Sequence, residues 1–179
     1  MQKSDSIVII PTYNEKENIE NIIRAVFGLE KTFHILIIED GSPDGTAAIV
    51  KELQKEFPNL PFHYVKGNND YLIDTPSKKM VRVGGKNLLL THGHKQRVHW
   101  NPDTISYWAA EQGVDVVLFG HTHMPFWDDS WHVAMFNPGS ISLPRGGGLP
   151  TFGILTIENG KVEGAIMEYW NAEHFKRIN

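Results

Sequence analysis

The sequence predicts an α/β fold, and two observations indicate it. Short apolar runs, typical of buried parallel strands, alternate with segments whose apolar residues recur at helical spacing. The length of 179 residues also suffices for one domain with a full-sized hydrophobic core. Such alternation favours a parallel sheet built from right-handed βαβ units.

The first third of the chain contains the clearest alternation. An apolar run at residues 7–10 stops at Pro11, and the later run at residues 34–38 is of the same kind. Between them, Ile19, Ile23 and Val26 have the spacing of the buried face of a helix. The elements expected here, in order, are strand 7–10, helix 15–27, strand 34–38, helix 46–57 and strand 62–65.

The pattern changes after residue 65. Gly84-Gly85 between two apolar runs indicates a hairpin, and Glu158-Asn159-Gly160 indicates another. Pro102 suits the first turn of a helix. The elements expected here are strands 80–83 and 87–90, helix 102–111, and strands 114–119, 131–136, 153–157 and 162–167.

Composition excludes several classes of protein. The chain has no cysteine, so any metal site must use histidine, carboxylate and amide oxygen. The net charge of −4 and the scattered Lys and Arg disfavour a nucleic-acid partner. No apolar run approaches the roughly 20 residues that cross a bilayer, so we expect no membrane partner. We see no signal peptide before the first strand and therefore expect a cytoplasmic location. Assembly into a homo-oligomer stays open.

Four polar motifs each follow a predicted strand. Ligands bind at the carboxyl ends of strands in open α/β sheets, so four motifs converging there exceed what composition would give. Taken alone, each has a structural interpretation, because a loop histidine is usually a surface residue and Asn68 suits a turn. Together they favour a metal site. The motifs are Gly67-Asn68-Asn69-Asp70, Thr91-His92-Gly93-His94, Gly120-His121-Thr122-His123 and Asn137-Pro138-Gly139-Ser140.

These residue types suit phosphoester hydrolysis, which needs an activated water and neutralised charge on the phosphoryl oxygens. Two metal ions roughly 3.5–4 Å apart supply both, with a bridging hydroxide as the nucleophile. Neutral imidazole suits manganese, iron, nickel or zinc, and the carbonyl oxygen of asparagine adds a hard ligand. His121 and His123 alternate on a segment expected to be extended, so we expect both side chains on the same side.

Residues 62–168 resemble the small bacterial phosphodiesterase branch of the calcineurin-like metallophosphoesterases. The matching segments are 65–70 (VKGNND), 90–94 (LTHGH), 118–123 (LFGHTH) and 136–145 (FNPGSISLPR). The resemblance implies a four-layer α/β/β/α sandwich with a dinuclear metal site. It also implies that Asn68, His92 and His121 bind the second metal ion and that His123 binds the first.

The front of the chain departs from this family, which opens with an Asp-x-His motif after its first strand. The sequence there is Pro11-Thr12-Tyr13-Asn14. Residues 6–58 instead resemble the N-terminal part of family-two glycosyltransferases of the dolichyl-phosphate mannose synthase kind, in segments 7–15 (IVIIPTYNE) and 38–46 (IEDGSPDGT). The later Asp-x-Asp motif of that family is missing. The chain therefore resembles a chimera of two βα-rich pieces, of natural, engineered or misassembled origin.

We expect these two pieces to form a single domain over residues 1–179. The βαβα segment 1–60, glycosyltransferase-like in sequence, would complete the sheet of the metallophosphoesterase-like portion 61–170. If the second strands of the two families superpose, Asp40 takes the place of the bridging aspartate.

The expected ligand set is therefore uneven. One metal site keeps Asp40, Asn68, His92 and His121, and the other keeps only Asp40 and His123. We expect one or two divalent ions per chain, manganese before nickel, iron or zinc, with one site intact and the other weak or empty. Asn14 or Glu15 would be the residues to compensate.

The predicted function is a metal-dependent phosphodiesterase that hydrolyses a small phosphoester and is impaired by the missing ligands. His94 or Arg145 would neutralise developing charge, but His94 equally suits orienting a ligand, and Arg145 equally suits an ordinary loop.

Two other functions stay open. One is a nucleotide-sugar glycosyltransferase in which Asp40 and Asp44 contact the nucleotide, although Asp44 equally suits a helix cap. The other is a non-catalytic chimera that acts as a metal-binding scaffold.

Overall fold

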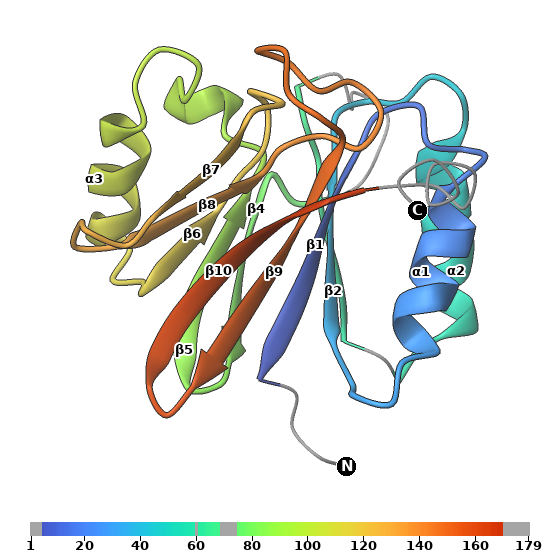
Figure 1. Ribbon diagram of the computed structural model, residues 1–179, viewed down its shortest axis with the longest axis horizontal. Coiled ribbons are helices and arrows are strands. Elements are labelled where there is room, and N and C mark those ends of the chain that lie inside the picture. Colours follow the sequence, from blue (N-terminus) through green and yellow to red (C-terminus); the bar gives the residue numbers. More distant parts are fainter. Residues whose placement is uncertain (1–4, 60, 69–74, 170–179) are drawn as a thin grey trace, which may run out of the picture.

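The described part of the chain, residues 5–59, 61–68 and 75–169 of a computed structural model, forms two five-stranded sheets (Figure 1). The strand order in the first sheet is β10-β9-β1-β2-β3. Its members are β1 (Ser6–Thr12), β2 (His34–Glu39), β3 (Phe62–Val65), β9 (Thr151–Glu158) and β10 (Lys161–Glu168). Every residue of β1 is buried, as expected of a central strand that is covered on both faces.

The first sheet joins the two ends of the chain. β1 runs parallel to β2, with Ile9 opposite Leu36, and β2 runs parallel to β3. On the other side β1 pairs antiparallel with β9, which forms a hairpin with β10. The glycosyltransferase-like segment and the C-terminal hairpin are thus hydrogen-bonded neighbours in one sheet.

The second sheet has the order β4-β5-β6-β8-β7. β5, β6 and β8 are parallel, and β4 and β7 flank them as antiparallel strands. The members are β4 (Lys78–Val83), β5 (Lys86–Thr91), β6 (Val116–Leu118), β7 (Pro125–Asp128) and β8 (Ala134–Pro138).

Three hydrophobic cores hold these elements together. The first lies between the two sheets and includes Leu36, Leu90 and Phe136. Helices α1 (Ile19–Phe27) and α2 (Thr46–Glu56) form the second core against the outer face of the first sheet. Helix α3 (Asp103–Glu111) forms the third against the second sheet, on the opposite side of the molecule (Figure 1). The predicted α/β class is therefore confirmed.

Several predicted boundaries were wrong. The first helix begins at Ile19 rather than Glu15, because the backbone N–H groups of Asn18 and Ile19 both bond to the carbonyl of Glu15 and make a turn there. Residues 131–133 are not a strand, and β8 begins at Ala134. The sequence also gave no indication of β7, since Pro125 opens it, which only an edge strand tolerates.

The fold brings the polar motifs to one end of the sandwich. The parallel strands of both sheets end there: the N–H of Asp40 bonds to the carbonyl of Thr12, and that of Gly120 bonds to the carbonyl of His92. Between the sheets, Gly120 sits against the side chain of Ile38, which closes the floor of the site. Among the described residues, no helix has the length and apolar character needed to cross a membrane.

Candidate metal centre

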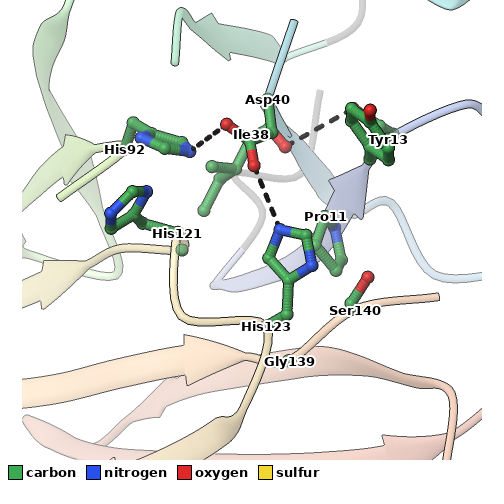
Figure 2. A pocket seen from close by; sticks show the side chains of 11 residues that line it. Pro11, Tyr13, Ile38, Asp40, His92, His121, His123, Gly139 and Ser140 are labelled. Carbon is green, nitrogen blue, oxygen red and sulfur yellow. Dashed lines mark hydrogen bonds and ion pairs between the residues drawn. The ribbon is translucent and has the colours of Figure 1, made fainter. Parts of the chain in front are cut away.

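Asp40 lies at the middle of the site, directly after β2 (Figure 2). Its Oδ1 is 3.0 Å from Nε2 of His92, and its Oδ2 is 3.0 Å from Nε2 of His123. The next strand packs closely here, because a side chain on Gly67 would overlap the carbonyl of Glu39. A single carboxylate thus faces histidines from two loops of the other sheet.

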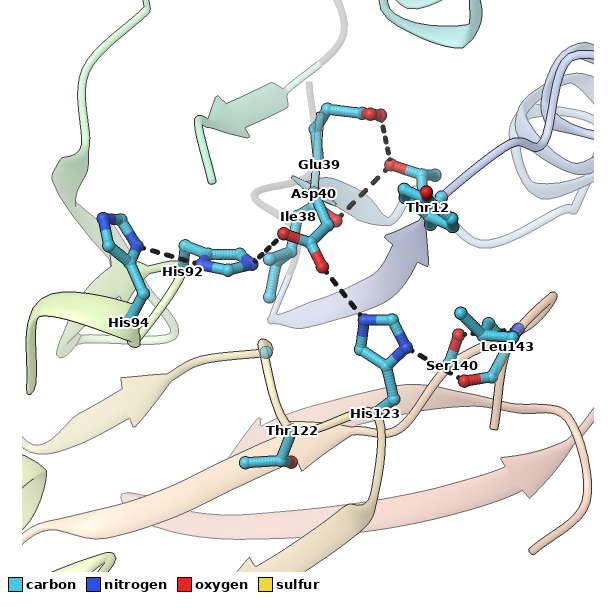
Figure 3. Close-up of polar contacts among 12 residues, drawn as sticks. Thr12, Ile38, Glu39, Asp40, His92, His94, Thr122, His123, Ser140 and Leu143 are labelled. Carbon is cyan, nitrogen blue, oxygen red and sulfur yellow. Dashed lines mark hydrogen bonds and ion pairs between the residues drawn. The ribbon is translucent and has the colours of Figure 1, made fainter. Parts of the chain in front are cut away.

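The neighbouring acid, Glu39, points the other way. As the last residue of β2 it alternates with Asp40, and its carboxylate accepts hydrogen bonds from Thr12 Oγ1 at 2.7 Å and from the N–H of Ser42 at 2.6 Å (Figure 3). Glu39 therefore anchors the loop after β2, and Asp40 alone of this pair faces the histidines.

His121 completes a three-residue cluster. One ligand atom from each of Asp40, His92 and His121 lies within 4.8 Å of the other two. The His121 ring meets the edge of His92, with ring centroids 4.9 Å apart. These three side chains come from the ends of β2, β5 and β6 and converge on one point.

The hydrogen bonds of the imidazoles indicate which ring nitrogens are free to coordinate. Nδ1 of His123 donates to the carbonyl oxygen of Leu143 at 2.9 Å, so Nε2 is the ring nitrogen that faces Oδ2 of Asp40. Nδ1 of His92 lies 3.0 Å from Nδ1 of His94 (Figure 3). Nε2 of His92 is buried and hydrogen-bonds to no described residue, although Asp40 Oδ1 is close.

The protonation states also favour a cation. Burial alone would raise the pKa of Asp40, but the contacts with His123 and His92 outweigh it and hold that pKa well below the usual range. Burial, and to a lesser extent the proximity of His92, lower the pKa of His121 to about 4. At neutral pH an ionised carboxylate therefore faces an unprotonated imidazole.

These donors fit a divalent metal ion. One carboxylate oxygen of Asp40 and one ring nitrogen each of His92 and His121 lie close enough together to be shared by one ion. Carboxylate and neutral imidazole are the ligands that first-row divalent metals prefer in proteins without cysteine.

The segment that carries His121 and His123 is not extended, so that prediction was wrong. Both residues have left-handed backbone conformations, with φ of +68° and +58°. Their rings consequently reach Asp40 from different directions, as Figure 2 shows. Such conformations are uncommon for residues other than glycine and need support from the surroundings.

Asn137 provides that support, and sequence reasoning gave it no role. Its fully buried side-chain amide donates to the carbonyl of Gly120 and to Oγ1 of Thr122, both at 2.9 Å, and its Oδ1 accepts from the N–H of Gly139 at 3.0 Å. It thereby fixes the turn that carries both histidines. The only signal in the sequence was its place directly after a strand.

On the Oδ2 side of Asp40, the described part of the chain brings His123 as the histidine ligand candidate. Pro11 and Tyr13 line the pocket there, next to His123. Glu15 does not compensate, because its carboxylate is buried and accepts from Nδ2 of Asn18 at 3.1 Å, and the residue does not line the pocket. Asn14 is exposed and also lies outside the lining.

The remaining predicted residues lie at the edges of the site. Asn68 follows Gly67, which packs against Glu39 and Asp40, and its Oδ1 is buried. Arg145 is exposed, and its backbone N–H donates to the carbonyl of His123 at 3.1 Å. Asp44 is used locally, because its carboxylate accepts from the N–H groups of Lys16 and Thr46. The residues Asn69 and Asp70 of the first motif lie outside the described residues.

A carboxylate among histidines, at the carboxyl ends of strands in a two-sheet α/β sandwich, is an arrangement that could hold a metal ion of the kind used in hydrolysis. Comparison with known families agrees. The profile of the calcineurin-like phosphoesterase superfamily domain matches residues 16–160. The chain belongs to this family, and the match begins just after the Pro11-Thr12-Tyr13-Asn14 segment.

Curated relatives carry the same likeness. The chain is 38% identical over 109 residues to the probable metallophosphoesterase YsnB of Bacillus subtilis, covering 60% of this chain and 64% of YsnB. It is 34% identical over 99 residues to the phosphodiesterase YfcE of Escherichia coli K12, covering 51% of this chain and 50% of YfcE. The matches thus span less than two thirds of these relatives.

The front segment matches a different protein. Over 54 residues the chain is 48% identical to the polyprenol monophosphomannose synthase of Mycolicibacterium smegmatis, covering 30% of this chain and 20% of the synthase. This match is short and partial.

Solved structures share the fold. A predicted phosphoesterase from Streptococcus pneumoniae TIGR4 superposes with a TM-score of 0.71 at 23% identity, covering 92% of this chain and 89% of that one. Vps29 of Entamoeba histolytica, solved in complex with Zn²⁺, superposes with a TM-score of 0.65 at 16% identity, covering 91% and 98%.

Proposed function

We propose that this chain is a metal-dependent phosphoesterase that acts as a phosphodiesterase on small substrates. The observation that carries the proposal is the cluster of Asp40, His92 and His121, whose ligand atoms all lie within 4.8 Å of one another. Membership of the calcineurin-like phosphoesterase superfamily supports it.

We assign one divalent cation to the Oδ1 side of Asp40, with His92, His121 and the amide oxygen of Asn68 as its other ligands. When bound, a divalent ion supplies Lewis-acid neutralisation of the phosphoryl oxygens and makes water more acidic. Manganese is the first choice, and zinc is the alternative that the Zn²⁺ complex of Vps29 suggests.

The side chains around this position orient the donors. We assign His94 as a positioning residue, because its Nδ1 lies 3.0 Å from Nδ1 of His92, and a hydrogen bond between these two atoms leaves Nε2 of His92 for the site. Burial, with neighbouring His92 and Lys95, lowers the pKa of His94 and favours its uncharged ring.

His123 faces a small hollow that opens to solvent and is lined also by Tyr13 and Ser140. A phosphoester that reaches the metal from this side would lie over the mouth of this hollow, beside His123. The guanidinium of Arg145, whose backbone is bonded to His123, is the candidate to bind a phosphoryl oxygen from the rim.

Metal analysis and turnover together test the proposal. The protein is stripped with a chelator, reloaded with Mn²⁺ and assayed for ion content and for hydrolysis of bis(p-nitrophenyl) phosphate. We expect one tightly held ion per chain and release of p-nitrophenolate only after reloading. Two tightly held ions would contradict the single-ion assignment, and a bound ion without turnover would favour a non-catalytic scaffold.

A second candidate function is binding of a nucleoside diphosphate by the front segment, which the match to polyprenol monophosphomannose synthase favours. Against it, Asp40 is held by two histidines, and Asp44 caps the start of α2. Calorimetric titration with uridine and guanosine diphosphates, in the absence of metal, tests it. Heat of binding that Asp44→Ala abolishes would support this candidate.

A further inference from the structure

Trp100 is the most exposed large hydrophobic residue among those that the structure describes, with 87% of its surface accessible. A fully exposed indole forgoes most of the free energy that burial would give it, so such a side chain calls for a reason. The other described tryptophans differ. Trp108 and Trp127 pack against the cores, and Trp131 is 38% exposed and meets the ring of Tyr107.

The loop that carries Trp100 is firmly held. The backbone N–H of Trp100 donates to the carbonyl of Arg97 at 3.0 Å, and Val98 is buried in the third core. On the other side, Asn101 accepts a hydrogen bond from the N–H of Asp103 at 2.7 Å and so begins α3. The indole is therefore presented to solvent by ordered backbone on both sides, which lowers the entropy lost when a ligand binds.

The same loop borders the metal centre. The ring of His99 packs against the ring of His121, with centroids 6.1 Å apart, and Trp100 meets His99 edge to face at 6.5 Å. The exposed indole is thus two ring contacts from a candidate metal ligand, a distance that a nucleotide-sized substrate can span from that ligand.

We propose that Trp100 is a specificity residue that stacks on a planar aromatic group, an aryl ring or a nucleobase, in the part of the phosphoester that stays on phosphorus when the ester is hydrolysed. The inference rests on the proposed function and adds the substrate class to it. An exposed indole suits any aromatic face, because stacking requires no particular pattern of hydrogen bonds, and stacking on one base is worth about tenfold in affinity.

The test uses three substrates that release the same p-nitrophenolate and differ in the group retained on phosphorus: methyl p-nitrophenyl phosphate, phenyl p-nitrophenyl phosphate and thymidine 5′-(p-nitrophenyl phosphate). With the Mn²⁺-loaded protein we expect kcat/KM for the phenyl or thymidine ester to exceed that for the methyl ester by about tenfold, mostly through KM. Preference for the thymidine ester over the phenyl ester would identify a nucleobase, and the reverse an aryl group.

Substitutions assign the preference to the indole. Trp100→Ala should reduce the aromatic-to-methyl ratio to near one, and Trp100→Phe should restore most of it. Trp131→Ala is the matched control, an exposed tryptophan elsewhere, and should leave the ratio unchanged. A ratio near one in the wild type, or one that survives Trp100→Ala, would overturn the proposal.

Binding separates this inference from the proposed function. Thymidine 5′-monophosphate and methyl phosphate are titrated calorimetrically into Mn²⁺-loaded wild type and Trp100→Ala. Tighter binding of the nucleotide by wild type alone supports stacking even if no ester is hydrolysed. Equal affinities for the two probes in the wild type contradict stacking even if all three esters are hydrolysed.

Discussion

The two oxygens of one carboxylate have different surroundings in this protein. Oδ1 of Asp40 faces His92, with His121 in the same cluster and Asn68 on the adjoining strand end. Among the described residues Oδ2 faces His123, and the pocket lining beside it includes Pro11 and Tyr13.

The difference lies in the loops that form the two sides. The histidines of both sides come from loops of the second sheet, whereas the loop after β1 brings Pro11 and Tyr13 to the pocket rather than a carboxylate or an imidazole. A buried parallel strand such as β1 needs only apolar side chains and correct pairing. A metal site is more demanding, because each ligand has to be a residue type that the ion binds.

The largest expected effect is on Mn²⁺ affinity, and it tests the difference between the Oδ1 and Oδ2 sides of Asp40. His121→Ala removes a donor on the Oδ1 side and should weaken Mn²⁺ binding more than 100-fold, beyond the roughly 10–100-fold that loss of an outer partner costs. His123→Ala, on the Oδ2 side, should weaken binding by less than about tenfold. Equilibrium dialysis measures both, with circular dichroism as the check on folding. Equal losses would mean that both sides hold the ion.

Asn137 should affect both sides of Asp40, because it holds the turn that carries His121 and His123. Asn137→Leu removes three buried hydrogen bonds at the turn that carries His121 and His123, and should lower the free energy of unfolding by about 3–5 kcal/mol. Urea denaturation of the metal-free protein measures this. Thr122→Val, which removes one of the three, should cost about 1 kcal/mol. A small effect of Asn137→Leu would show that the turn holds its conformation unaided.

His94 acts on the Oδ1 side alone. Because Nδ1 of His94 is within hydrogen-bond distance of Nδ1 of His92, His94→Leu should weaken Mn²⁺ binding by about 10–100-fold, whereas His94→Asn keeps a hydrogen-bonding group and should stay within a few-fold of the wild type. On the Oδ2 side a backbone carbonyl, that of Leu143, orients His123. Equilibrium dialysis measures the Mn²⁺ affinity of both variants. Similar losses of affinity in the two would mean that His94 acts through its charge or its size rather than through the hydrogen bond to His92.

The smallest expected effect is on the pH dependence of stability. It concerns the opposite end of β2, where the ring of His34 stacks on that of His63 with centroids 5.5 Å apart. Burial, with the charges of Lys79 and His34, lowers the pKa of His63 to about 4 from its ordinary 6.5. Between those pH values only the unfolded chain takes up the proton, so stability falls as the pH drops from 6.5 toward 4 and the effect ends below that.

His63→Leu should remove about 1–2 kcal/mol of this pH dependence, after allowance for the partly exposed ring. Urea denaturation at pH 7 and pH 4.5, wild type against variant, measures the difference. The same pH dependence in both proteins would place the titrating group elsewhere. His132→Leu, at an exposed loop position, is the control and should leave the pH dependence as it is.

Much of the fold followed from the sequence. Strand 34–38, helix 46–57 and the hairpin at Gly84-Gly85 appear within about two residues of their predicted bounds, because apolar periodicity and turn residues act locally. β7 did not follow, because an edge strand that begins with proline owes its pairing to β8 rather than to its own sequence.

The sequence by itself determined which chemistry is available: without cysteine, the histidine motifs and Asp40 are the residues that can hold a cation. Only the tertiary structure decided how they are arranged. In the folded protein, His121 and His123 have left-handed backbone conformations. Asn137 holds the turn that carries them through its hydrogen bonds. The carboxylate of Glu15 is hydrogen-bonded to Asn18 and does not serve the site. These outcomes depend on contacts between residues far apart in the chain, and local sequence patterns carry no information about such contacts.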